Sequence, residues 1–152
     1  MSEQIGYSMS TAETVRFLEQ QGHGTLSLAA DNRAYGIPIS YGYDEDYDRL
    51  VMEFVSTETS KRKRFAESTD EVTLTTYEFR DQTTWASVVV TGTLHNVPPE
   101  KVSSQAAALF FHRADDAAGD DRWRNDMFDK EWYEIDIETI SGRQGEQIPS
   151  KE

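Results

Sequence analysis

Residues 24–43, GTLSLAADNRAYGIPISYGY, predict a β-hairpin. Over residues 24–30, leucines alternate with small or polar side chains, which is the two-residue period of a half-buried strand. Asp31 and Asn32 are residues that tight turns favour, and residues 34–43 continue as a second strand. Pro38 has no N–H to donate to a sheet ladder, so we expect it at an edge, at a bulge or facing a ligand.

A helix is expected before this hairpin, over residues 11–21. Ser10 and Glu13 form a capping box, in which the serine oxygen accepts a free helix N–H and the glutamate reaches back. Gly22 is suited to the left-handed backbone conformation that ends many helices.

Further strands and helices are predicted along the rest of the chain. Two-residue periodicity and β-branched residues predict strands at 49–56, 71–79, 85–97 and 131–138. One helix is expected from the basic run to about residue 67, and another from Pro98-Pro99. The tail, residues 141–152, is expected to be frayed at its end. Strands joined by short hairpins, with attached helices, indicate one β-barrel domain over residues 1–152.

The composition is strongly acidic, with 28 Asp and Glu against 15 Lys and Arg and a formal net charge of −13. Adaptation to high salt explains such a surface, and an ordinary acidic protein is the alternative. Nucleic acid and anionic membranes are unfavourable partners for this charge. The chain has no cysteine, which excludes disulfides and thiolate chemistry. It has no signal-type N-terminus and no apolar run of roughly 18 residues, so we expect a cytoplasmic protein.

Four consecutive basic residues stand out in the run SKRKRFAES at residues 60–68. In so acidic a chain, the run is too short and isolated to favour nucleic-acid binding. A solvated helix face, paired with nearby glutamates, is a second interpretation. The third is an anion site, because the run opens a helix directly after a strand, and the first N–H groups of a helix bind anions.

The anion interpretation assigns a role to each part of this run. Thr59 and Ser60 would cap the helix. Lys61 and Arg62 would add charge-assisted hydrogen bonds to a phosphate. We expect the two remaining cations to face solvent and to pair with surrounding glutamates.

Other candidate sites have weaker support. The histidines at positions 23, 95 and 112 are too far apart for a metal-binding pair, and we expect His112 to be a structural residue at a helix end. The acidic run 44–48 lacks the glycine and the final glutamate of a calcium loop, so we expect a solvated hairpin. The sequence contains no nucleophile-elbow, zinc-protease or phosphate-loop motif.

The order of these elements resembles the pyridoxamine 5′-phosphate oxidase-like FMN-binding split barrels. The likeness rests on a helix followed by GTLSLAADNRAYGIPISYGYD, RLVMEFVSTETSK, EVTLTTYEF, WASVVVTGTL and WYEIDIETISGRQG, and it covers about residues 8–146. Within the family, the chain is similar to the small, very acidic haloarchaeal type. The resemblance implies a six-stranded antiparallel split β-barrel with two to three flanking helices. It also implies a homodimer with two FMN sites at the subunit interface.

The resemblance further implies which residues bind FMN. The backbone of the second strand would lie along the flavin ring, the third strand and the following turn would hold the phosphate, and the fifth strand would begin near the pyrimidine edge of the ring. The implied residues are Ile37, Pro38, Ile39, Ser40 and Tyr41 along the ring, Phe54, Val55, Ser56, Thr59, Ser60, Lys61 and Arg62 at the phosphate, and Trp85 and Ser87 at the pyrimidine edge. Arg143 and the closing strand would belong to the partner subunit's site or to the core.

A flavin-dependent redox reaction on a small-molecule substrate is the function that the resemblance implies, with hydride passing to or from the flavin. The C-terminal segment with which pyridoxamine phosphate oxidases hold their substrate is not recognisable, so that substrate is not carried over. No side chain stands out as a general acid or base. The alternative is a non-enzymatic protein that holds flavin, or haem through His112 or His95, on the same barrel.

Overall fold

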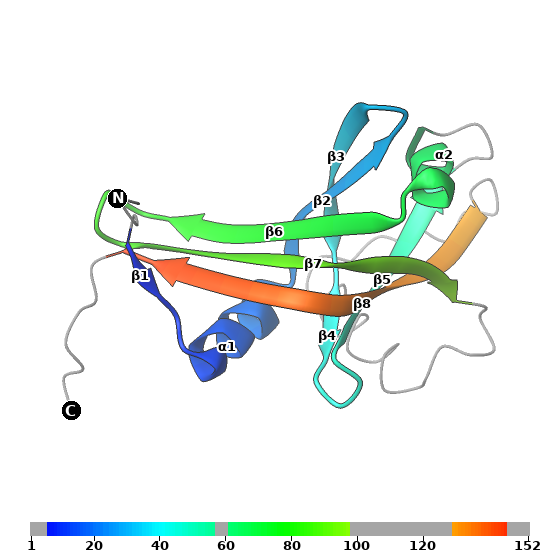
Figure 1. Ribbon diagram of the computed structural model, residues 1–152. Helices are drawn as coiled ribbons and strands as arrows, with labels where there is room; N and C mark the ends of the chain where they lie inside the picture. Colours follow the sequence, from blue (N-terminus) through cyan, green and yellow to red (C-terminus); the bar gives the residue numbers. More distant parts are fainter. Residues whose placement is uncertain (1–5, 57–60, 98–128, 146–152) are drawn as a thin grey trace, which may run out of the picture.

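The computed structural model describes residues 6–56, 61–97 and 129–145, which form a mostly β fold with two helices (Figure 1). The strands are β1 (Tyr7–Ser8), β2 (His23–Ala30), β3 (Arg33–Ser40), β4 (Gly42–Asp44), β5 (Arg49–Ser56), β6 (Glu71–Phe79), β7 (Trp85–Val97) and β8 (Asp129–Gln144), and the helices are α1 (Thr11–Gln21) and α2 (Lys61–Ser68). The sheet has the order β3-β2-β6-β7-β8-β5-β4, and β1 pairs with β8. Neither described helix is long and apolar enough to cross a membrane.

Helix α1 has the predicted bounds and both predicted caps. The Glu13 amide donates to Ser10 Oγ at 3.1 Å, and the Ser10 amide donates to Glu13 Oε1 at 2.8 Å. The hydrogen bond from the Ser10 amide to the Glu13 carboxylate is the largest cause that lowers the pKa of Glu13. Gly22 adopts the left-handed conformation with φ of 66°, which a glycine accepts without steric cost.

The β2–β3 hairpin is also confirmed. Asp31 and Asn32 have φ of 52° and 62°, and they join strands that pair from Ala30 and Arg33 onwards. Positive φ at both central residues is the mark of a type I′ turn, whose twist matches that of the flanking strands. Pro38 lies on the edge strand β3, one of the three positions expected for it.

The apolar residues predicted to alternate along the strands form one core. Leu26 and Leu28 of β2 are buried, as is Leu18 of α1, which covers one face of the long strands. The strand β7 bulges between Thr91 and Gly92, where it pairs with β8. A Cβ at Gly92 would lie 2.2 Å from the Asp136 carbonyl oxygen, so only glycine permits this close approach.

The six-strand prediction was wrong in the number of strands and in closure. The expected strand 34–43 is broken into β3 and β4 at Tyr41, whose buried hydroxyl donates to the Leu18 carbonyl at 2.6 Å. The two-residue β1 adds a further strand. Among the described residues, β3 and β4 end the strand order without pairing with each other, so the backbone ladder is not closed. The fold is an open relative of the expected barrel.

Strand β8 (Asp129–Gln144) extends beyond both predicted bounds, 131 and 138. Residues 141–144, the start of a tail expected to be frayed only at its end, complete β8 by pairing with β7 and β1. The helix expected from Pro98-Pro99 and the last residues of the tail lie outside the described residues.

The acidic run 44–48 is only partly the solvated turn that was expected. Asp44 is fully buried, and its Oδ2 lies 3.2 Å from Arg49 Nε. Arg49 Nη1 lies 2.6 Å from Glu134 Oε2 of β8. Arg49 therefore compensates a buried carboxylate, and it ties the β4–β5 hairpin to the centre of the sheet. The other four residues of the run are exposed.

Replacing Arg49 with methionine is expected to lower the free energy of unfolding by about 3 kcal/mol, because it leaves the Asp44 carboxylate buried without its cation. Urea denaturation at fixed salt measures this change. Arg80→Met is the matched control, because the side chains of Arg80 and its partner Glu78 are 72% and 47% exposed; we expect a loss below about 1 kcal/mol. Equal losses in the two variants would contradict the role given to Arg49.

Candidate functional site

Helix α2 is fixed on two sides, and this determines where its side chains lie. At its C-terminal end, Thr69 Oγ1 donates to the Phe65 carbonyl at 2.5 Å and accepts from the Ala29 amide of β2 at 3.3 Å. On the other side, Lys63 Nζ lies 3.5 Å from Glu131 Oε1 of β8. The helix therefore lies between the tip of the β2–β3 hairpin and the start of β8 (Figure 1).

The carboxylate of Glu131 also fixes an aromatic pair below α2. The Tyr133 hydroxyl donates to Glu131 Oε2 at 3.0 Å, and the Tyr133 ring centroid lies 4.5 Å from that of Phe54 on β5. Burial raises the pKa of Tyr133 to about 12, so its phenol stays protonated at neutral pH. Its hydroxyl is a hydrogen-bond donor that links Glu131 to the aromatic pair.

The four cations of the basic run point in three directions. Lys61 and Arg64 are three residues apart and share one face of α2, which is the face that lines a pocket. The Arg62 guanidinium carbon instead lies 6.0 Å from the Phe54 ring centroid. Lys63 pairs with Glu131 of β8, with Nζ 3.5 Å from Oε1. Arg64 is exposed, as expected, but its place beside Lys61 on the pocket face was not predicted, and no described glutamate pairs with it.

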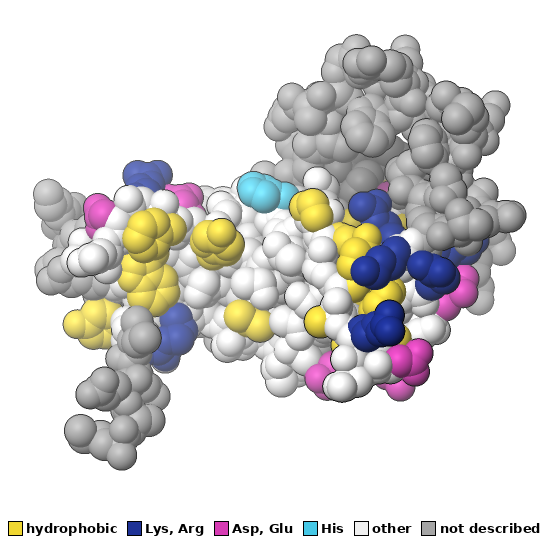
Figure 2. Space-filling model, turned by 90° about the horizontal axis from the view of Figure 1, so that it is seen from above, with side chains coloured by type: hydrophobic (Ala, Val, Ile, Leu, Met, Phe, Trp, Pro, Cys, Tyr) yellow, Lys and Arg dark blue, Asp and Glu magenta, His cyan; other side chains and the backbone are white. Residues whose placement is uncertain are grey.

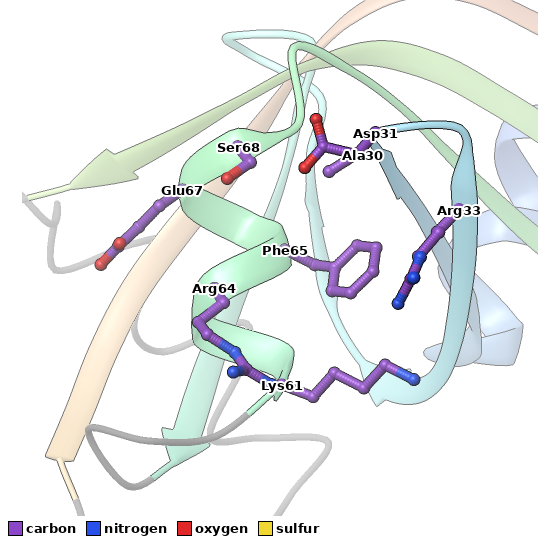
Figure 3. A pocket seen from close by; sticks show the side chains of 8 residues that line it. All are labelled: Ala30, Asp31, Arg33, Lys61, Arg64, Phe65, Glu67 and Ser68. Carbon is purple, nitrogen blue, oxygen red and sulfur yellow. The ribbon is translucent and has the colours of Figure 1, made fainter.

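The pocket lies between α2 and the hairpin tip, has a volume of about 610 Å³, and opens to solvent. Its lining residues are Ala30, Asp31, Arg33, Lys61, Arg64, Phe65, Glu67 and Ser68. Figure 3 shows Arg33 of β3 and Lys61 of α2 extending into the same space, with the Phe65 ring beside them. Asp31 lies toward the opposite end of the pocket, and the Glu67 side chain points away from the hairpin. One end of the pocket is therefore cationic.

No described carboxylate pairs with the cations of this end. In the part of the chain that the structure describes, Arg33, Lys61 and Arg64 form no ion pair, whereas Arg49, Lys63 and Arg80 do. Lys61 Nζ lies 5.1 Å from the Tyr35 ring centroid and 5.8 Å from that of Phe65. Figure 2 shows basic side chains gathered over the end of the molecule that carries α2. Such a cluster favours an anionic ligand.

The residues implied for the flavin ring lie along the edge strand β3 and just after it. Ile37, Ile39 and Tyr41 direct buried side chains into the core, whereas Pro38 and Ser40 are exposed. Among the described strands, β3 pairs with β2 alone. An edge strand leaves a row of backbone N–H and C=O groups without a ladder partner, and a heterocycle can hydrogen-bond to such groups.

The residues implied for the phosphate lie near the start of α2. Phe54 is buried, Val55 and Ser56 complete β5, and Lys61 and Arg62 open the helix. Thr59 and Ser60 lie outside the described residues. The edge strand and the helix start meet where Lys61 of α2 lies over Tyr35 of β3.

Trp85 and Ser87 are not brought to this place. They begin β7 at the opposite end of the long strands, paired with Phe79 and Tyr77 of β6. Phe79 is 63% exposed and Tyr77 is 65% exposed, and Tyr7 of the nearby β1 is also exposed. One copy of the chain therefore holds two separate parts of the implied FMN site, and the second part adjoins the exposed aromatic side chains of Tyr77 and Phe79.

Sequence reasoning missed two pocket residues. Arg64 carries a usable signal, because its spacing of three from Lys61 places both side chains on one helix face. Arg33 carries none, because only the packing of α2 against the hairpin brings it to Lys61. Of the suspected haem ligands, His95 is exposed on β7, and His112 lies outside the described residues.

A comparison with protein families finds one matching model. A model described as pyridoxamine 5′-phosphate oxidase matches residues 10–144, which is most of the chain. No curated protein matches the sequence.

Solved structures with the same fold include proteins whose names mention flavin. An FAD-binding protein from Mesorhizobium loti has a TM-score of 0.74 and 20% identity, with 95% of this chain and 100% of that chain covered. The FAD binding protein from Mycobacterium smegmatis has a TM-score of 0.60 and 20% identity, with 91% and 97% covered. An FAD and haem binding protein from the same organism has a TM-score of 0.65 and 16% identity, with 94% and 75% covered. At these identities, the likeness shows the fold.

Proposed function

The chain belongs to the pyridoxamine 5′-phosphate oxidase family, and on that premise we propose that it is a flavoprotein that carries out a redox reaction on a small-molecule substrate. The proposed cofactor is FMN, either as the free nucleotide or as the flavin half of FAD. Flavin supplies hydride transfer when it is bound, and the chain's own residues bind and orient it. The FAD-binding names of two structural neighbours support a flavin cofactor.

The observation that carries the proposal is the position of Lys61. Lys61 is the first residue of α2, and its side chain reaches the edge strand β3, where its ammonium lies 5.1 Å from the Tyr35 ring centroid. A phosphate beside Lys61 would receive a charge-assisted hydrogen bond. The attached ring could then lie along the exposed edge of β3 near Pro38 and Ser40. The same arrangement gives no support to nucleic-acid binding, for which the basic surface is too small.

Absorption spectroscopy of the purified protein, with and without added FMN, tests the proposal. We expect the near-ultraviolet and blue bands of oxidised flavin, shifted from those of the free cofactor. Lys61→Ala should weaken FMN binding by about 1.5–3 kcal/mol, the typical contribution of a hydrogen bond to a charged group. Arg16→Ala, an exposed change on α1, is the control. A wild-type protein that takes up neither FMN nor FAD would refute the proposal, and a Soret band would favour the haem alternative.

We further propose that the protein is a homodimer with flavin at the subunit interface. Two observations support this arrangement: Trp85 and Ser87 lie far from Lys61 within one chain, and exposed Phe79 and Tyr77 adjoin them. Exposed aromatic patches are common at protein–protein interfaces. A second copy that covers this patch would supply Trp85 and Ser87 to the site of the first.

Light scattering of wild type and Phe79→Glu tests the dimer. We expect the wild type at twice the chain mass and the variant at the chain mass, because a buried unpaired carboxylate is unfavourable at an interface. Flavin affinity should fall with the loss of the dimer. Tyr47→Glu, at an equally exposed aromatic residue in the β4–β5 turn, should leave the mass unchanged. A monomeric wild type, or a dimeric Phe79→Glu, would exclude this interface.

We also propose that the acidic surface is an adaptation to a high-salt cytoplasm. With a net charge of −13, self-repulsion is strongest at low ionic strength, because the screening length shortens as salt rises. The melting temperature, measured by circular dichroism in rising concentrations of potassium chloride, should therefore increase up to molar salt. A melting temperature that does not change with salt would indicate an ordinary acidic protein.

A further inference from the structure

We propose that the pocket between α2 and the β2–β3 hairpin binds the second phosphate and the nucleoside of a flavin dinucleotide, so that FAD is the preferred cofactor. This inference rests on the proposed function, in which Lys61 holds the phosphate attached to the flavin. It adds a site beyond that phosphate, formed by side chains to which the proposed FMN site gives no role.

The order of residues along β3 places this pocket beyond the first phosphate. The ring is proposed near Pro38 and Ser40, and Lys61 contacts β3 at Tyr35. Arg33 is two residues further along the strand and lines the pocket. At about 3.3 Å per residue, Arg33 lies roughly 7 Å beyond Tyr35, on the side away from the ring. A ligand that ends at its first phosphate would leave this part of the site empty.

The charges of the pocket fit a diphosphate better than a single phosphate. Arg33 and Lys61 extend toward the same space (Figure 3), and Arg64 lines it from the same face of α2. No described carboxylate pairs with any of the three. Guanidinium groups bind phosphate oxygens through two parallel hydrogen bonds. Two arginines beside the proposed phosphate lysine therefore provide donors for a second phosphate.

The remainder of the pocket suits a nucleoside. The half-buried Phe65 ring lies beside the cations, supported by Tyr35 at 5.2 Å between centroids, and aromatic faces stack with any base. Asp31 lies at the other end, and a carboxylate there can accept hydrogen bonds from ribose hydroxyls. The volume of about 610 Å³ lies within the usual range for small-ligand sites, about 300–1,000 Å³.

The test compares FMN and FAD by calorimetric titration of the flavin-free protein at one fixed salt concentration. We expect wild type to bind FAD at least about tenfold more tightly than FMN, because the pocket adds charge-assisted contacts. Arg33→Gln and Arg64→Gln should each weaken FAD binding by about tenfold and leave FMN binding unchanged. Arg80→Gln, at the far end of β6, is the charge-matched control and should change neither affinity.

The outcomes separate this inference from the proposed function. Equal wild-type affinities for FMN and FAD, or equal losses for both ligands in the two pocket variants, would overturn the pocket assignment while a flavoprotein remains. Binding of neither flavin by wild type would overturn both. Arg33 and Arg64 are exposed, so the variants should fold, and an unchanged urea midpoint verifies this.

Discussion

Strand β8 pairs with β5 along one edge and with β7 along the other. Among the described residues, this pairing is the only backbone ladder that joins the strands β3, β2, β6 and β7 to the strands β5 and β4. Strands β5 and β6 follow each other in the chain but lie on opposite sides of the β7–β8 pair. The connection between them must therefore cross the open side of the sheet. Helix α2 lies in this crossing and packs against β2 and β3. The position of the pocket is a consequence of this strand order.

The pocket concentrates positive charge in a chain that otherwise carries a large negative excess. Holding Arg33, Lys61 and Arg64 near one another, with no carboxylate partner among the described residues, is electrostatically unfavourable, and a bound anion would relieve this repulsion. The proposed flavin site would use this arrangement to bind a phosphate. Arg49 differs from these three cations, because its ion pairs with Asp44 and Glu134 hold the β4–β5 hairpin to β8.

Local patterns predict the parts of the fold that neighbouring residues determine. Helix α1, the β2–β3 hairpin and the bounds of β5, β6 and β7 depend on caps, turn residues and periodicity within a few positions. The end of β8 and the whole of β1 depend on pairing between residues more than fifty positions apart, which no local pattern encodes. The residues of the candidate site show the same difference. Lys61 can be recognised from its place after a strand, whereas Arg33 comes close to Lys61 only through tertiary packing.

The two-residue turn at Asp31 and Asn32 also limits how this pocket can evolve. One inserted residue would shift the register of β3 against β2, turning its buried isoleucines outward and its exposed residues into the core. Arg33 directly follows the turn, so its place in the pocket depends on the same register. Substitution at Arg33 would change the charge of the pocket and leave the register intact, whereas an insertion in the turn would disrupt the core. Turn length should be constant across lineages whose pockets have become different.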